Sequence, residues 1–201
     1  MTILIIIITC FVSIMAFSRN DITEKLQFNA AKIYHKHEYY RLISHGFVHA
    51  NWEHLIVNMI VLYSFGRATE LYFHYNFGRM ANAYFLILYF GGMLFSNVYA
   101  LIKHRDNPYY NAIGASGAVS SILFCTILFN PWSKIYFFGV LPIPGVLFAL
   151  LYLVYCGYMN KKGGDSIAHD AHLLGSLFGL IFPIIMDPNL LESFLKKLLN
   201  F

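Results

Sequence analysis

The tetrapeptide Gly114-Ala115-Ser116-Gly117 lies near the middle of the chain, and the residues that follow it are mostly apolar as far as Phe129. Small residues on a helix surface allow a second helix to approach closely, so the tetrapeptide predicts a tight helix contact. A serine in this setting is also a candidate nucleophile. Taken alone, the tetrapeptide favours ordinary helix packing, because glycine, alanine and serine are common at helix contacts in membranes.

The composition predicts an integral membrane protein. Of the 201 residues, 58% are hydrophobic and 12% are charged, and the mean hydropathy is +0.57. Soluble domains have roughly 45–50% apolar and about 25% charged residues. The length fits a single domain over residues 1–201. The formal net charge of +4 suits contact with membrane lipid headgroups and indicates no nucleic-acid partner.

The apolar runs predict an all-α membrane protein, a bundle of six transmembrane helices. Each span needs about 17–25 mostly apolar residues, and polar or proline-containing stretches separate the runs. The longest polar segment, Arg19–Asn51, is expected to form short helices at the membrane interface. The expected spans cover residues 2–17, 52–72, 81–102, 112–129, 143–159 and 167–186, followed by a short interfacial tail at 190–201.

A histidine lies in the last of these runs, one helical turn before a pair of glycines. Gly175 follows His172 by three residues, and Gly179 follows Gly175 by four, so the three share one side of a helix. The glycine pair predicts a flat face against which another helix packs. His172 is therefore a candidate general base, and the alternative is a histidine that is hydrogen-bonded to a backbone carbonyl.

His54 and Asn58 form a third polar group, on one face of the second expected helix. Both side chains can donate hydrogen bonds, and donors that converge on one point stabilise an oxyanion. The alternative is a polar contact between helices, typically worth about 1 kcal/mol. Together with Ser116 and His172, however, the pair completes the nucleophile, base and donor set that acyl transfer requires.

These motifs together resemble those of the rhomboid intramembrane serine proteases, in their basic six-helix bacterial form. The resemblance extends from the second expected helix through the sixth, and the spacings in combination are specific although each alone is weak. The matching residues are Gly114-Ala115-Ser116-Gly117, then Ala171-His172-Leu173-Leu174-Gly175 with Gly179, and His49 with His54-x-x-x-Asn58, Gly66 and Glu70.

The resemblance implies a role for each residue of the candidate site. Ser116 would be the nucleophile and His172 the general base of a dyad that has no third acid. His54 and Asn58, with the backbone N–H of Ser116, would stabilise the oxyanion. Asp170 is not expected to act as a triad acid, because at two residues from His172 it points to another side of the helix. No cofactor and no metal are implied.

The resemblance also implies the reaction and its place. The chain would cleave single-span transmembrane proteins within or near the membrane, and no obligate partner is expected. It would be a multi-pass protein of a bacterial inner (cell) membrane, with the active site open to the non-cytoplasmic side. The positive-inside rule predicts the opposite orientation. Nine of the 14 Lys and Arg lie in loops on the same side as Arg19–Asn51, and the rule places the side richer in these residues in the cytoplasm. A folded segment counts less in that rule, so the orientation implied by the resemblance is preferred.

Two positions depart from the family pattern. Some members carry a tyrosine four residues after the serine, stacked on the histidine, whereas this chain has Ser120 there. Another group must therefore hold the ring of His172. The long first loop often carries Trp-Arg in the family, and here the pair is Tyr40-Arg41.

Two other functions compete with proteolysis. A rhomboid-like pseudoprotease would bind transmembrane helices without cutting them, but such proteins usually lack the serine or the histidine. The second competing function is that of a histidine-rich metal or haem protein, with His45 and His49 as a possible ligand pair. No cysteine or carboxylate is expected to complete a ligand set. The three cysteines, Cys10, Cys125 and Cys156, have no CxxC spacing and are interpreted as buried apolar residues.

Overall fold

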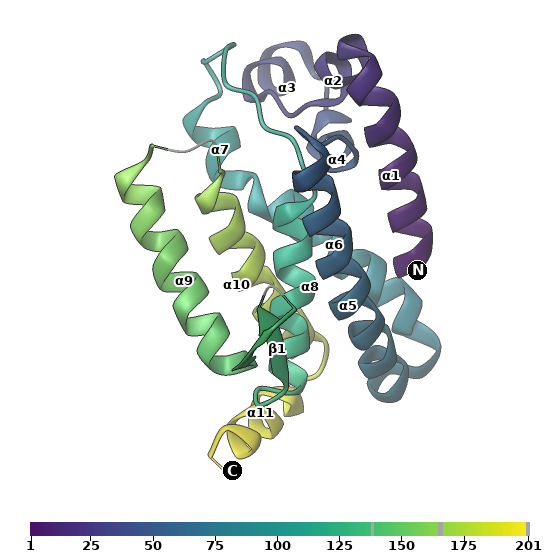
Figure 1. Cartoon of the computed structure of the whole chain (residues 1–201), viewed down its shortest axis with the longest axis vertical. Helices are drawn as coiled ribbons and strands as arrows, with labels where there is room; N and C mark the ends of the chain where they lie inside the picture. The colour runs from purple at the N-terminus through teal and green to yellow at the C-terminus, as the bar shows by residue number, and fades with distance from the viewer. Residues whose placement is uncertain (138, 165–166, 200–201) are drawn as a thin grey trace.

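The computed structural model describes residues 1–137, 139–164 and 167–199 and is mostly helical, as predicted (Figure 1). Each of the six expected apolar runs contains a helix. The elements in order are α1 (Thr2–Ser18), α2 (Asn20–Leu26), α3 (Ala30–Lys36), α4 (Arg41–Ser44), the 3-10 helix η1 (His45–Phe47), α5 (Trp52–Phe77), η2 (Gly78–Met80), α6 (Ala81–Ser96), α7 (Val98–Lys103), α8 (Ser116–Phe129), β1 (Lys134–Phe137), β2 (Leu141–Pro144), α9 (Gly145–Lys162), α10 (His169–Met186) and α11 (Asn189–Leu199).

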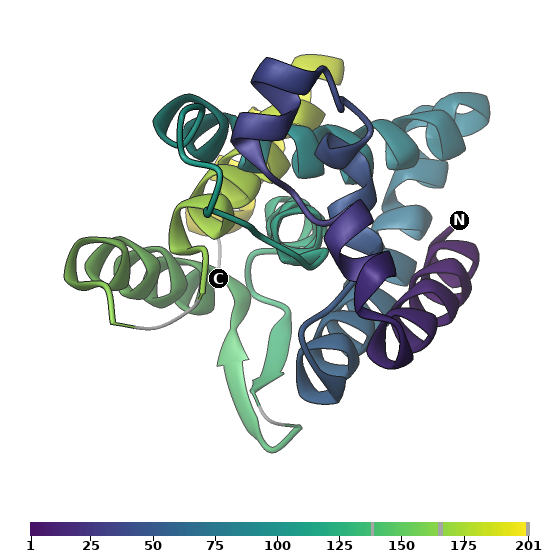
Figure 2. The same ribbon diagram turned by 90° about the horizontal axis from the view of Figure 1, so that it is seen from above.

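The helix α8 lies at the centre of the bundle, and Figure 2 shows it end-on between the other helices. Every residue from Gly117 to Phe129 is buried. A helix that is apolar on all sides is stable only when other elements cover all of it, and here α5, α6 and α10 pack against α8. Ser116, the first residue of α8, therefore lies at the start of a helix that is enclosed by protein.

Two glycines bring α10 into backbone contact with α8. A Cβ atom added to Gly175 would lie 2.2 Å from the carbonyl oxygen of Gly117, and one added to Gly179 would lie 2.2 Å from that of Ser121. No side chain fits in either place. The close-packing face predicted from the glycine pair is therefore present, and its partner is the helix that begins at Ser116.

The outward faces of the helices carry large apolar side chains. Ile7 and Phe11 of α1, Ile60 of α5 and Leu150 of α9 are all at least 60% exposed. Such surfaces are unfavourable in water and suit contact with lipid. By length and hydropathy, two helical stretches within the described residues can cross a membrane, namely Trp52–Lys103, which contains α5 to α7, and α10. The helices α1 and α8 are apolar but shorter.

Several predicted helix boundaries are wrong. The third expected helix is interrupted at Asn97, whose side-chain amide donates to the carbonyl of Met93 at 2.8 Å and so competes with regular helix hydrogen bonding. The fourth begins at Ser116 and not at residue 112, because Gly114 has a φ of +111°, which a helix does not allow. The second helix extends to Phe77, and the sixth begins at His169.

A β-hairpin precedes α9, so the all-helical prediction is wrong at this point. Its strands are antiparallel, with Lys134 opposite Pro144 and Phe137 opposite Leu141. Pro142 and Pro144 cannot donate backbone hydrogen bonds, but each strand of a two-stranded sheet has a free edge that tolerates proline. The fifth expected helix accordingly begins at Gly145. The expected tail forms α11, and its residues 200–201 lie outside the described part of the chain.

The Arg19–Asn51 segment folds into short helices, as predicted. The buried guanidinium of Arg41 donates to the carboxylate of Glu38 at 2.5 Å and to the carbonyl oxygens of Glu24 and Gln27 at 2.9 and 2.7 Å. A buried guanidinium requires such partners for its donors. Arg41 thereby ties α4 to the end of α2 and organises the segment.

Candidate functional site

Ser116 is partly buried and follows a sharp turn of the backbone. The turn requires the positive φ of Gly114, a conformation that costs glycine little and other residues more. A cavity of about 20 Å³ lies beside the serine and is also lined by His45, Ser96 and Asn97. A space of that size has room for about one water molecule.

The segment between α1 and α5 holds the turn in place. The carbonyl of His45 accepts a hydrogen bond from the N–H of Gly114 at 2.9 Å, and Nε2 of His49 accepts one from the N–H of Ala115 at 3.4 Å. Phe28 and Ala112 exchange two backbone hydrogen bonds of 2.9 and 3.1 Å. The position of the candidate nucleophile therefore depends on a segment that is remote in sequence.

The contacts of His49 assign its protonation state. The hydroxyl of Ser13 donates to the carbonyl of Phe47 at 2.8 Å, so its oxygen is an acceptor for Nδ1–H of His49 at 2.9 Å. Nε2 then carries the lone pair that accepts from Ala115. Burial lowers the pKa of His49 to about 3, and burial lowers that of His45 to about 4. Both histidines are neutral near pH 7.

Acid is therefore expected to destabilise the folded chain below about pH 6.5. An unfolded histidine takes up a proton near pH 6.5, whereas folded His45 and His49 do so only near pH 4 and 3. The unfolded state binds more protons in this window, so the free energy of unfolding falls as the pH falls, by about 1.4 kcal/mol per pH unit per histidine. Thermal unfolding in detergent between pH 7 and 4 measures this slope.

The variant His49→Gln should show a shallower slope, because glutamine does not titrate. The matched control is His74→Gln, which replaces an exposed histidine of α5 and should keep the slope of the parent protein. Equal slopes for the parent protein and His49→Gln would contradict the assignment of His49 as a neutral, buried acceptor.

A tyrosine from α9 supports the ring of His172. The rings of Tyr152 and His172 are stacked, with centroids 6.1 Å apart and planes inclined by 19°. The hydroxyl of Tyr152 lies 3.0 Å from that of Ser120. The ring that some family members place four residues after the serine is thus supplied here by another helix, and Ser120 holds its hydroxyl. The sequence contains no signal for this pairing, because it depends on how α9 packs.

His54 lies against the turn that precedes Ser116. A Cβ atom added to Gly114 would be 2.6 Å from Cε1 of His54, so the imidazole occupies the space that the glycine leaves open. Asn51 begins α5 by accepting a hydrogen bond from the N–H of His54 at 2.8 Å. Asn58 is buried one turn farther along, and its amide donates to the carbonyl of His54 at 2.8 Å. His54 is therefore in contact with the turn.

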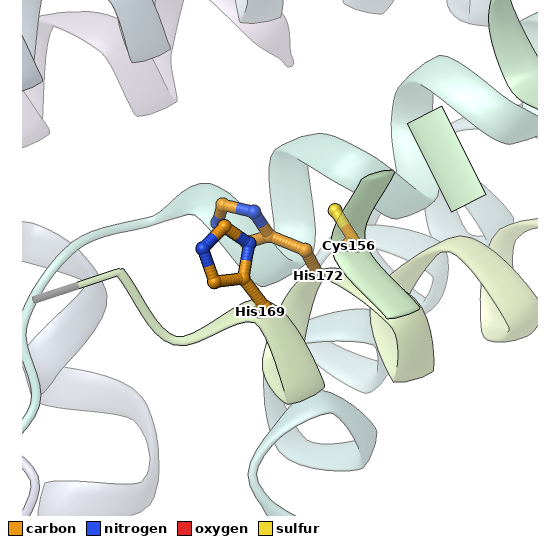
Figure 3. Close-up of side chains that lie close together, drawn as sticks. All are labelled: Cys156, His169 and His172. Atoms are coloured by element: carbon orange, nitrogen blue, oxygen red, sulfur yellow. The ribbon is translucent and has the colours of Figure 1, made fainter. Parts of the chain in front are cut away.

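Cys156 and two histidines come together where α9 packs on α10, as Figure 3 shows. The Cys156 sulfur, one ring nitrogen of His169 and one of His172 lie within 4.8 Å of one another. The sequence predicts that no cysteine completes a histidine ligand set, and the structure places Cys156 beside two of the histidines. The members of this trio are separated in sequence by a loop, so spacing along the chain does not reveal it.

Comparison with known proteins identifies the family of the chain. The family model of the Rhomboid domain matches residues 36–188. The chain is similar to RHOMBOID-like protein 12, mitochondrial, of Arabidopsis thaliana, with 30% identity over 70% of the chain and 44% of the relative. Rhomboid-related protein 1 of Caenorhabditis elegans is 26% identical over 82% of the chain and 44% of the relative.

Rhomboid protein 1, mitochondrial, of Saccharomyces cerevisiae is 30% identical over 70% of the chain and 40% of the relative. The chain thus spans less than half the length of these curated relatives. The matched range contains α5 to α10 and with them Ser116, His172, His54 and Asn58. On this match, the chain belongs to the rhomboid family, whose members are embedded in membranes.

Proposed function

We propose that the chain is an intramembrane serine endopeptidase that cleaves transmembrane segments with a dyad of Ser116 and His172. The observation that carries the proposal is the backbone contact between Gly117 and Gly175, which joins the helix of the serine to the helix of the histidine. Gly117 is the neighbour of Ser116, and Gly175 lies one turn from His172. The family, which includes serine proteases, supports the same reading.

In the proposed reaction, Oγ of Ser116 attacks the carbonyl carbon of the scissile peptide bond and His172 accepts the hydroxyl proton. The oxyanion is stabilised by the N–H of Ser116, at the N-terminus of α8, and by His54 and Asn58. His172 then protonates the leaving amine, and water hydrolyses the acyl-enzyme. The dyad is neutral at rest, so no carboxylate has to be buried beside it.

The proposed arrangement in the membrane has six spans, formed by α1, α5, α6 with α7, α8, α9 and α10. The exposed apolar faces support it, and short spans suit a serine that water must reach. We place the end that carries Ser116 and the Arg19–Asn51 segment on the non-cytoplasmic side of a bacterial cell membrane. Protease protection of this segment in oriented vesicles tests the orientation, and cleavage only from the cytoplasmic side refutes it.

The proposed substrates are single-span membrane proteins with a helix that unwinds easily and a small residue at the cleaved bond. They would approach past α9, whose buried residues are Gly145 and Cys156 and whose remaining residues are at least partly exposed. A helix with so little buried surface separates from the bundle at low cost. Membrane lipid surrounds both enzyme and substrate, and the reaction uses no cofactor.

Labelling with a fluorophosphonate tests the proposal directly, because this reagent forms a covalent bond with activated serines. The purified protein in detergent should be labelled, and the variants Ser116→Ala and His172→Ala should not. Equal labelling of all three proteins would place the reactive group elsewhere. No labelling of a folded parent protein would favour a pseudoprotease that binds helices without cleaving them.

Removing the ring of Tyr152 is expected to slow cleavage by about 10- to 100-fold in Tyr152→Ala, because a poorly oriented base loses much of the benefit of proximity. Tyr152→Phe keeps the stacked ring and loses only the hydrogen bond to Ser120, worth about 1 kcal/mol, so its rate should fall much less. Reporter cleavage in proteoliposomes gives the rates. Equal rates for Tyr152→Ala and the parent would show that the ring does not position His172.

A further inference from the structure

The faces of α9 and α10 that meet near the candidate site carry a group of metal-binding side chains. On α9, Tyr152 and Cys156 are four residues apart and therefore lie on one face. On α10, His169 and His172 are three residues apart and share the facing side. Cys156 and His169 are buried and His172 is partly buried. Two of the three side chains are thus shielded from bulk solvent, and the third is the proposed base.

The donor set and its spacing fit one class of metal ion. Zinc bonds are about 2.3 Å to a thiolate and about 2.0–2.1 Å to imidazole nitrogen, so the ligand atoms of a tetrahedral site lie roughly 3.3–3.6 Å apart. Here the three atoms lie within 4.8 Å of one another. Movements on the order of 1 Å, which side-chain rotations can supply, close that difference. One sulfur and two nitrogens favour zinc over magnesium or calcium, which prefer oxygen ligands.

Aromatic side chains hold the two imidazoles in this arrangement. The ring of Tyr155 packs edge-on against His169, with centroids 5.6 Å apart and planes at 81°. Tyr152 stacks on His172, and the two imidazoles pack edge to face at 6.1 Å. These contacts restrict the rings to few orientations, and a partly organised ligand set loses less entropy when it binds an ion.

We propose that Cys156, His169 and His172 form a zinc-binding site that switches off the proposed protease by coordinating its general base. Three protein ligands leave the fourth position of a tetrahedral ion to water. Binding releases the thiol proton of Cys156 and uses a lone pair of His172, so the imidazole cannot accept the proton of Ser116. Zinc binding itself does not depend on catalysis, whereas the inhibition rests on the proposed function.

Cobalt(II) provides a direct test of the site, because it replaces zinc and absorbs light in a way that reports thiolate coordination. Chelator-treated protein in detergent should bind one cobalt ion with a thiolate-to-metal absorption band, and zinc should displace it. Cys156→Ser should lose the band, and His169→Asn should bind at least about tenfold more weakly. Cys125→Ser, which alters a buried cysteine of α8, is the matched control and should bind as the parent does.

Activity measurements then distinguish zinc binding from inhibition of cleavage by zinc. Zinc should inhibit reporter cleavage by the parent and by Cys125→Ser, and chelator should restore it. The same zinc concentration should inhibit Cys156→Ser and His169→Asn far less, each relative to its own zinc-free rate. Absence of the thiolate band, or its survival in Cys156→Ser, would refute the proposed zinc-binding site. Full activity of the zinc-loaded parent would refute inhibition by zinc. A parent protein that binds the metal but never cleaves would refute the proposed function and leave the zinc-binding site intact.

Discussion

Replacing Ser116 with alanine is expected to lower the rate of reporter cleavage by a factor on the order of 10⁴–10⁶, which in a slow membrane protease means no detectable product. Removal of the nucleophile eliminates the covalent pathway, and the remaining oxyanion donors supply only a small residual rate. The oxygen of Ser116 has no substitute at the start of α8, because the next hydroxyls, of Ser120 and Ser121, are buried at least one turn farther along. Cleavage of a transmembrane reporter in proteoliposomes, followed by gel electrophoresis, measures the loss.

Ser121→Ala is the matched control, since it removes the same atom from the same helix. The hydroxyl of Ser121 donates to the carbonyl of Ala118 at 2.9 Å, so this hydrogen bond lies within α8. This variant should cleave the reporter at a rate close to that of the parent protein. Persistent cleavage by Ser116→Ala would refute the assignment of the nucleophile, whatever the control shows.

Placing a methyl group on Gly175 is expected to cost about 3 kcal/mol of stability or more. The added Cβ would lie 2.2 Å from the carbonyl oxygen of Gly117, and a backbone atom cannot rotate away as a flexible side chain can. Overpacking in a core typically costs about 1–3 kcal/mol, and a clash with backbone belongs at the upper end. Denaturation of Gly175→Ala in mixed micelles, followed by circular dichroism, gives the difference.

Gly157→Ala is the control for the effect of replacing glycine with alanine within a helix. Gly157 also lies within a helix, but an added Cβ would meet no atom within 4 Å. Alanine favours a helix by up to about 1 kcal/mol over glycine, so this variant should be as stable as the parent or slightly more so. If Gly175→Ala behaved like Gly157→Ala, the helices α8 and α10 would not be in backbone contact.

The mostly helical fold and the membrane setting could be predicted from the sequence because both depend on local composition. A run of apolar residues is stable in lipid only when its own backbone hydrogen bonds are satisfied, and a helix satisfies them within the run. The glycine pair of α10 could likewise be recognised, since three- and four-residue spacing defines a helix face. The hairpin before α9 cannot be predicted in this way, because two prolines exclude a helix without specifying which other structure forms.

The spacing of residue types along the chain indicates the candidate residues, but the surroundings of these residues depend on contacts between distant segments. Ser116, His172 and His54 are recognisable from their spacing within three separate runs. Tyr152 and Cys156 are not, because they occupy an otherwise ordinary apolar helix and acquire their partners only when α9 packs on α10. The order of residues thus specifies which helices form and which small residues allow them to meet. Tertiary packing alone decides what faces each polar group, because a hydrogen bond or metal ligand depends on distance in space and not on separation along the chain.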